Sequence, residues 1–190
     1  MTPIDRTPDI PALPNHGGQA NVPGLRRLWL IEARHVLAVV DPRTVPGILD
    51  VGWHLPSQGL NLTEDAIIYD WRFRSRQGSY EEKTTITVQG IVYGQSIKLV
   101  VPKDAPETTL ACYRMGRRKW LAIYHDSNGL VRLVGTPNQP LRFDQQLTIG
   151  ANERVLTFTG ESKLPSLYIT EADVLYLSAL LGFESDFSLL

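Results

Sequence analysis

The chain has 190 residues, with 19 Lys and Arg against 20 Asp and Glu and a formal net charge of −1. This length suffices for one domain with a sizeable core, and the balanced charge argues against a sequence-specific nucleic-acid partner, because such proteins usually carry a basic excess. Cys112 is the sole cysteine, which excludes an intrachain disulfide, and we find neither a membrane-spanning apolar stretch nor, at Met1–Arg6, a signal peptide.

Residues 1–24 form the first unusual segment. Prolines and glycines that prevent regular helix or sheet stand at Pro3, Pro8, Pro11, Pro14, Gly17, Gly18, Pro23 and Gly24. Such a segment is typical of a disordered tail or of an extended arm that a neighbouring subunit holds. We expect an arm of the second kind, followed by one domain at 25–168 and a C-terminal segment at 169–190.

Residues 25–40 predict one or two extended segments, because their apolar side chains continue until proline interrupts them. Residues 47–65 show no regular periodicity. We expect Trp53, Leu55 and Leu60 to anchor this irregular segment to the core.

The most regular alternation of the chain lies in residues 66–101. Ile67, Tyr69, Trp71 and Phe73 fall on one side of an extended chain, and Asp70, Arg72 and Arg74 fall on the other. This period of two is typical of a half-buried β-strand. A turn is indicated at 77–79, and the β-branched residues at 84–88 predict the returning strand. We therefore expect a long β-hairpin with a polar, mobile tip at 74–82.

One helix is predicted in the middle of the chain. Residues 104–107 combine a capping Asp, a first-turn proline and an acidic residue three positions after the cap. We expect the helix at about 105–115. Its apolar stripe would consist of Pro106, Leu110 and Tyr113.

Two further strand pairs complete the predicted domain. Residues 120–125 and 130–134 flank Asn128-Gly129, which suits the positive φ angles of a hairpin turn. Residues 141–149 and 154–160 predict the second pair. With about seven strands and one packed helix, we expect a mainly β fold, a β-barrel or β-sandwich with a long hairpin and one flanking α-helix.

The C-terminal segment predicts a short apolar helix. Residues 170–173 resemble a capping box, and the helix would extend to about Leu181. It is apolar nearly all round, through Val174, Leu175, Tyr176, Leu177, Ala179, Leu180 and Leu181. A helix without a polar face is either buried in a core or shared with a partner, and both alternatives stay open.

No signature of catalysis or metal binding is present. His16, His35, His54 and His125 have no second ligand at the spacing of a metal site. Nucleophile-elbow, P-loop and dinucleotide-binding motifs do not occur. We therefore expect no catalytic residue, no cofactor and no metal. His125-Asp126 resembles an oriented base, but a polar pair at the mouth of a hairpin more often only begins a turn.

A recurring order of turn and strand motifs runs through the domain. It consists of Val101-Pro102-Lys103-Asp104, the helix, Trp120–Asp126, Asn128-Gly129, Arg132–Pro137, Pro140–Phe143 and Thr157–Gly160, preceded by Pro23–Trp29. This order resembles small structural tail proteins of tailed bacteriophages and prophages, especially those of Bacteroidetes-type hosts. The resemblance covers roughly residues 23–168. It implies a tail tube, a terminator or connector, or a baseplate ring, in which hairpins of adjacent subunits join.

We predict from these observations a non-enzymatic structural subunit of a phage tail or virion. Its partners would be copies of itself in a ring and neighbouring virion proteins, with assembly in the bacterial cytoplasm. Self-association should then be lost on deletion of residues 1–24 or 171–190. Two alternatives stay open: a monomeric β-barrel that binds a sugar or peptide through Trp53 or Trp120, and an enzyme with a diffuse site near His125 and Asp126.

Overall fold

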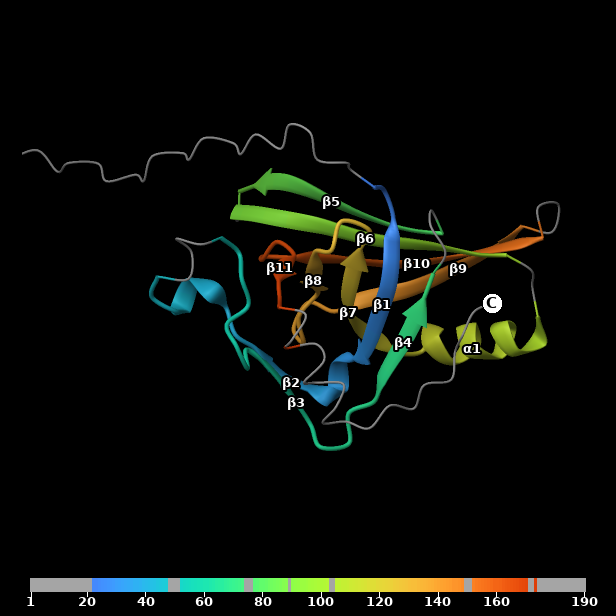
Figure 1. The fold of residues 1–190 in the computed structure, drawn as a ribbon, viewed down its shortest axis with the longest axis horizontal. Coiled ribbons are helices and arrows are strands. Elements are labelled where there is room, and N and C mark those ends of the chain that lie inside the picture. The colour runs from blue at the N-terminus through green and yellow to red at the C-terminus, as the bar shows by residue number, and fades with distance from the viewer. Residues whose placement is uncertain are drawn as a thin grey trace, which may run out of the picture.

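A computed structural model of the chain describes residues 22–47, 52–73, 77–88, 90–102, 105–148, 152–170 and 173. The mainly β class is confirmed, because 55% of these residues lie in strands. Within the described ranges α1 (Pro106–Gly116) is the one α-helix with defined bounds, and two short 3-10 helices lie at Ala33–His35 and Pro42–Thr44. Figure 1 shows the arrangement of these elements.

Nine strands form one antiparallel sheet, and two more form a small second sheet. The large sheet contains β1 (Leu25–Glu32), β4 (Ile68–Arg72), β5 (Gly78–Thr87), β6 (Gly90–Pro102), β7 (Lys119–Asp126), β8 (Val131–Val134), β9 (Leu141–Thr148), β10 (Glu153–Ser162) and β11 (Leu167–Tyr168). One half runs in the order β4-β1-β7-β8-β11, and the other half runs β9-β10-β6-β5. The small sheet consists of β2 (Val36–Val39) and β3 (Leu60–Leu62).

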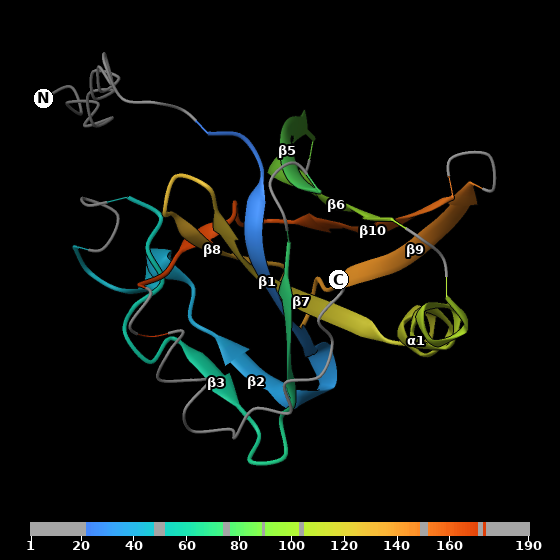
Figure 2. The ribbon, with the colours of Figure 1, turned by 45° about the vertical axis from the view of Figure 1, so that its right-hand side comes forward.

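The two halves of the large sheet meet at β7. Lys119 and Trp120 at its start pair with β9, whereas residues 122–125 pair with β8. Between β8 and β9 the residues 135–140 leave the sheet, and Gly135 opens this loop with a φ of 82°. The sheet bends here, so that in Figure 2 β6 and β10 run across the direction of β1 and β4. The finer prediction of a barrel or sandwich is not confirmed, because nine of the described strands form one bent sheet, in which β5 is an edge strand.

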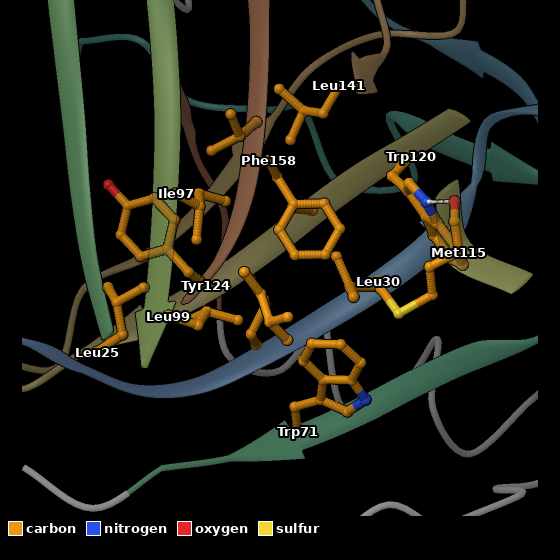
Figure 3. Packing of buried hydrophobic residues seen from close by; sticks show 14 of the residues in the cluster. Leu25, Leu30, Trp71, Ile97, Leu99, Met115, Trp120, Tyr124, Leu141 and Phe158 are labelled. Carbon is orange, nitrogen blue, oxygen red and sulfur yellow. Dashed lines mark hydrogen bonds between the residues drawn. The ribbon is translucent and has the colours of Figure 1, made fainter. Parts of the chain in front are cut away.

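The first hydrophobic core lies inside the bend and takes residues from both halves. Its members include Leu28 and Leu30 of β1, Trp71 of β4, Ile97 and Leu99 of β6, Trp120 and Tyr124 of β7, Leu156 and Phe158 of β10, and Met115 of α1 (Figure 3). Phe158 is fully buried, with the rings of Trp71 and Trp120 edge-on to it at centroid distances of 6.2 and 6.5 Å. Burial of such aromatic side chains contributes strongly to stability.

A second core lies on the opposite face of β1, β4 and β7. The small sheet and the segment after Gly52 cover it. Because both faces are covered, the continuous apolar run at 28–31 alternates between the two cores. Leu60 is buried here, and Trp53 and Leu55 pack against the same cluster, as their role as anchors predicted.

The predicted position of the long hairpin is wrong. Strand β4 pairs with β1, and the hairpin consists of β5 and β6, whose last pair is Thr87 with Gly90, so that the hairpin does not close at 77–79. Gly78 lies within β5, where the Cβ of any other residue would come within 3.1 Å of Leu25 and Leu99. This glycine allows a close approach of strands, and its sequence context does not distinguish that role from a turn. The expected polar tip at 74–82 is therefore also wrong, since residues 78–82 belong to the base of the hairpin.

The predicted packing face of the helix is wrong as well. Helix α1 occupies almost the expected range, with Ala105 as its N-cap, while Asp104 lies outside the described residues. Cys112 and Met115 are buried, whereas Leu110 and Tyr113 are 50% and 62% exposed. Two residues along a helix correspond to a rotation of about 200°. The sequence therefore carries two candidate stripes on opposite faces of the helix, Leu110 with Tyr113 and Cys112 with Met115. The second stripe is the buried one.

Most of the predicted arm and of the C-terminal helix lies outside the described residues. At the inner end of the arm, the Val22 amide donates to the Asn128 side chain, and Ser127 donates its amide to the Gly24 carbonyl. At the other end, the Asp173 amide donates to the Thr170 hydroxyl over 3.1 Å. This is the contact of the predicted capping box.

We expect Met115→Ala to lower the free energy of unfolding by roughly 2–5 kcal/mol, because it leaves a cavity in the first core. Leu110→Ala on the opposite face of α1 is the matched control and should change it by about 0.5 kcal/mol or less. Urea unfolding of both variants measures the difference. Equal effects of the two substitutions would contradict the packing of α1.

Candidate functional site

His125 and Asp126 lie at the end of β7, where the sequence placed a weak catalytic alternative. The Asp126 carboxylate accepts hydrogen bonds from the amides of Asn128 and Leu130 over 2.9 and 2.8 Å. These contacts close the β7–β8 turn and account for Asp126 as a turn residue. The carboxylate is therefore engaged by the backbone, which is the arrangement that the turn interpretation predicts.

The tryptophans that were considered for ligand binding have different positions. Trp120 is 2% exposed, and its indole nitrogen donates to the Met115 carbonyl over 3.2 Å (Figure 3). It cannot contact a ligand, so the binding alternative is wrong for this residue. Trp53 is half-buried against the second core.

The described histidines contact different groups. His35 contacts the Thr63 hydroxyl at 3.2 Å, and His54 stacks on Tyr168 at a centroid distance of 5.4 Å, while His16 lies outside the described residues. Within the part of the chain that the structure describes, no group of three His, Cys, Asp or Glu side chains could hold a metal ion. None of the described helices is long and apolar enough to cross a membrane.

The base of the β5–β6 hairpin is fixed by one carboxylate. Oε2 of Glu82 accepts hydrogen bonds from the Tyr80 hydroxyl and the Ser166 amide, each over 2.7 Å, and from the Gln95 side-chain amide over 3.3 Å. The ring of Tyr80 packs on Tyr124 of β7 at a centroid distance of 4.7 Å. Burial, together with the bond to Glu82, raises the pKa of Tyr80 far above its ordinary value.

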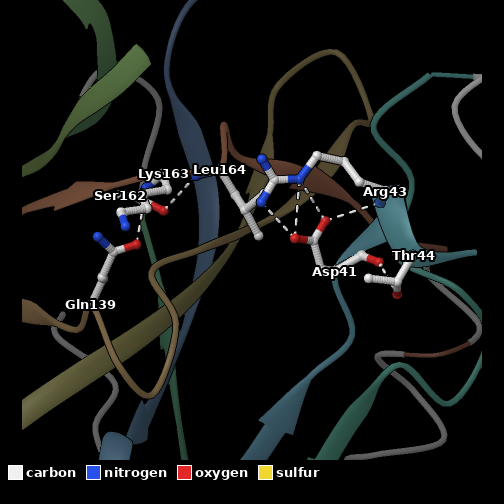
Figure 4. Close-up of polar contacts among 7 residues, drawn as sticks. All are labelled: Asp41, Arg43, Thr44, Gln139, Ser162, Lys163 and Leu164. Carbon is white, nitrogen blue, oxygen red and sulfur yellow. Dashed lines mark hydrogen bonds and ion pairs between the residues drawn. The ribbon is translucent and has the colours of Figure 1, made fainter. Parts of the chain in front are cut away.

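The segment that contacts Glu82 is itself held in place. The Lys163 amide donates to the Gln139 side-chain oxygen over 2.9 Å, and the Leu164 amide donates to the Ser162 hydroxyl over 3.0 Å (Figure 4). These bonds connect the end of β10 to the loop at 135–140. The hairpin base therefore rests on a segment with its own hydrogen-bond supports.

A second polar contact in Figure 4 closes a short turn near the small sheet. The Asp41 carboxylate accepts from the backbone amide of Arg43 over 2.9 Å and from its guanidinium over 2.6 Å, and the Thr44 hydroxyl donates to the Asp41 carbonyl. The hydrogen bond from Arg43 lowers the pKa of Asp41. This contact lies at the surface and stabilises a 3-10 turn.

The outer half of the hairpin lacks such supports. The pairing of β6 with β10 ends at Tyr93 and Ser162, so residues 84–88 and 90–92, which we call the hairpin tip, form a two-stranded ribbon. In Figure 1 this closed end lies at the periphery of the molecule. An isolated two-stranded ribbon is only marginally stable in water.

The hairpin tip exposes apolar side chains and a free strand edge. Ile86 and Val88 are 83% and 106% exposed, and Ile91 is 50% exposed. Residues 84–88 contain no charge and no proline, and β5 pairs with β6 alone among the described strands. The charged residues of β5, Glu81, Glu82 and Lys83, lie nearer its base, and an uncharged stretch of edge strand such as 84–88 can pair with another chain. The β-branched run at 84–88 was recognised in the sequence, but the hairpin turn was predicted before this run. The signal for the actual turn is Gly90, which has a φ of 116°.

Comparisons of the chain with protein-family models, with curated proteins and with solved structures find no match. The functional interpretation therefore depends on the geometry of the hairpin and on the motif order in the sequence.

We expect Tyr80→Phe to lower the free energy of unfolding near pH 7 by roughly 1–2 kcal/mol, because Glu82 loses a hydrogen bond. In the wild type the pKa of Tyr80 is raised in the folded state. The contribution of Tyr80 to the free energy of unfolding is therefore fully present below the pKa of an unfolded tyrosine, near 10, and is lost as the pH rises above that pKa.

The stability difference between wild type and variant should accordingly narrow above pH 10, by at most about 1.4 kcal/mol per pH unit. Urea unfolding of both proteins at pH 8, 10 and 11 measures this difference in stability. A difference that stays constant over this range would contradict the role of Tyr80.

Proposed function

We propose that this protein is a non-enzymatic structural subunit of a phage tail or a related particle, and that it assembles into a ring through its hairpin tip. The uncharged end of the β5 edge, residues 84–88 with exposed Ile86 and Val88, is the observation that supports assembly. The motif order across residues 23–168 supports the class of particle. The partners would be further copies of the chain and neighbouring virion proteins.

A second copy is the occupant that best suits this surface. An antiparallel edge strand can be extended by any strand of matching length, and identical copies provide one in every subunit. A ring closes the free edge of each subunit against its neighbour and leaves no edge for further growth in the plane. The formal net charge of −1 allows many copies to pack without strong mutual repulsion.

The division of the hairpin into two halves also supports assembly. The base is fixed by Glu82 and by the packing of Tyr80 on Tyr124. The tip has no described third strand to pack on. A rigid base determines the direction in which the tip extends, and pairing with a neighbour would provide the missing strand.

We expect the double variant Ile86→Lys/Val88→Lys to weaken self-association tenfold or more, since two side chains worth roughly 1.5–3 kcal/mol each on burial are replaced by charges. The double variant Leu37→Lys/Leu147→Lys is the matched control, because both leucines are exposed but lie on other strands. The measurement is the molar mass in solution over a concentration series, with negative-stain images of the same samples.

Rings, stacked tubes or a discrete multimer that the control retains and the tip variant loses would support the proposal. A wild-type monomer at every concentration would contradict it, as would a tip variant that assembles like the wild type.

A further inference from the structure

A recess with a basic lining lies at one end of strands β1, β4 and β7. Its volume is about 600 Å³, and its basic side chains are Arg26, Arg27, Arg72 and His125. Val22, Phe73 and Ser127 complete the wall. None of these residues belongs to the hairpin tip, so the recess is a separate surface of the molecule.

Strand register brings three of the basic residues into one row. Arg27 of β1 lies directly opposite Arg72 of β4 on one side and opposite His125 of β7 on the other. Like charges directly opposite each other across strands are destabilising. The next residues on the same face, Trp29 and Ile123, belong to the second core. The row thus places a concentration of positive charge at the end of this face, next to Asp70 and to the second core.

A local irregularity adds the fourth basic residue. The register between β1 and β7 shifts by one residue between Leu25 and Arg27, which leaves Arg26 as the extra residue of a β-bulge. The bulge allows both Leu25 and Leu28 to reach the first core, although they are three positions apart. Bulges commonly redirect side chains beside functional sites. Here the bulge directs an exposed arginine to the same recess.

One carboxylate only partly neutralises this charge. Asp70, whose side chain is 6% exposed, accepts two hydrogen bonds from Arg27 over 2.7 and 2.6 Å and lies 3.6 Å from Arg72. The Arg27 guanidinium also packs over the Trp29 ring at 4.6 Å. Among the described residues Arg26 forms no ion pair. The guanidiniums of Arg26, Arg27 and Arg72 against the carboxylate of Asp70 leave a formal charge of about +2 at the recess when His125 is counted as neutral.

We propose that this recess binds a phosphate monoester. The excess charge matches a phosphate monoester, which carries about −1.5 to −2 at neutral pH, better than it matches a single carboxylate or phosphodiester. Guanidinium groups bind phosphate oxygens through paired N–H donors, and His125 and Ser127 add an imidazole and a hydroxyl at the same wall. Arg27 is fixed by Asp70 and Trp29, so Arg26 and Arg72 are the arginines that would close on the ligand.

A phosphate monoester can belong to a small phosphorylated molecule or to the 5′ end of a nucleic acid. Calorimetric titration of the full chain with phenyl phosphate, with benzoate as the carboxylate of similar size, tests the first source. Titration with a short single-stranded oligonucleotide, with and without a 5′-phosphate, tests the second. We expect phenyl phosphate to bind at least tenfold tighter than benzoate.

The variant for this test is Arg26→Gln/Arg72→Gln, since both side chains are exposed and the ion pair between Arg27 and Asp70 remains. The control Lys98→Gln/Arg114→Gln makes the same change in net charge on β6 and α1. Binding of the phosphate monoester should fall at least tenfold in the first variant and stay unchanged in the control. Urea unfolding of both variants checks that they are folded, and Arg26→Gln alone serves as the milder substitution.

Three results would overturn the proposal. These are failure of the wild type to bind either phosphate monoester, an equal loss in the control variant, and unchanged binding of phenyl phosphate in Arg26→Gln/Arg72→Gln. None of them depends on self-association, so this test and that of the hairpin tip have separate outcomes.

Discussion

Strand β7 is the constraint on which the rest of this fold depends. It pairs with β1 along one edge and with β8 and then β9 along the other, and that division bends the sheet. Its side chains alternate between the two cores, with Trp120 on one side and Leu121 and Ile123 on the other. The same strand seats the other elements: Trp120 bonds to the end of α1, and Tyr124 packs on the hairpin base. A change in the register of β7 would therefore displace helix, hairpin and recess together.

Elements that depend on local pattern could be predicted from the sequence. Asn128-Gly129 identified the β7–β8 hairpin, and the strands predicted at 141–149 and 154–160 correspond to β9 and β10 within one or two residues. The partner of β4 could not be predicted in this way, because it depends on a contact with β1 about forty residues away. The helix face was missed for a similar reason, since only the core beneath α1 selects between its two stripes.

The hairpin tip and the basic recess could be predicted even less from local sequence pattern. The β-branched run at 84–88 is visible in the sequence, yet it is a tip only because β10 ends opposite Tyr93. Arg27, Arg72 and His125 lie on three strands, β1, β4 and β7, that are far apart in the sequence. No local pattern joins them, and the near-neutral net charge conceals them because charges elsewhere compensate. Only strand register collects them into one row.

The two surfaces lie at opposite ends of β5. Gly78, at the start of this strand, lies against Leu25 beside the bulge that carries Arg26. The ten residues of β5 then extend to the tip, which at about 3.3 Å per residue places the tip some 30 Å from its base. Gly78 permits this close packing, because a Cβ there would lie 3.1 Å from Leu25 and from Leu99, closer than side chains normally pack. The position of one glycine thus links the direction of the hairpin to the geometry of the basic recess, while the length of the strand separates the hairpin tip from the recess.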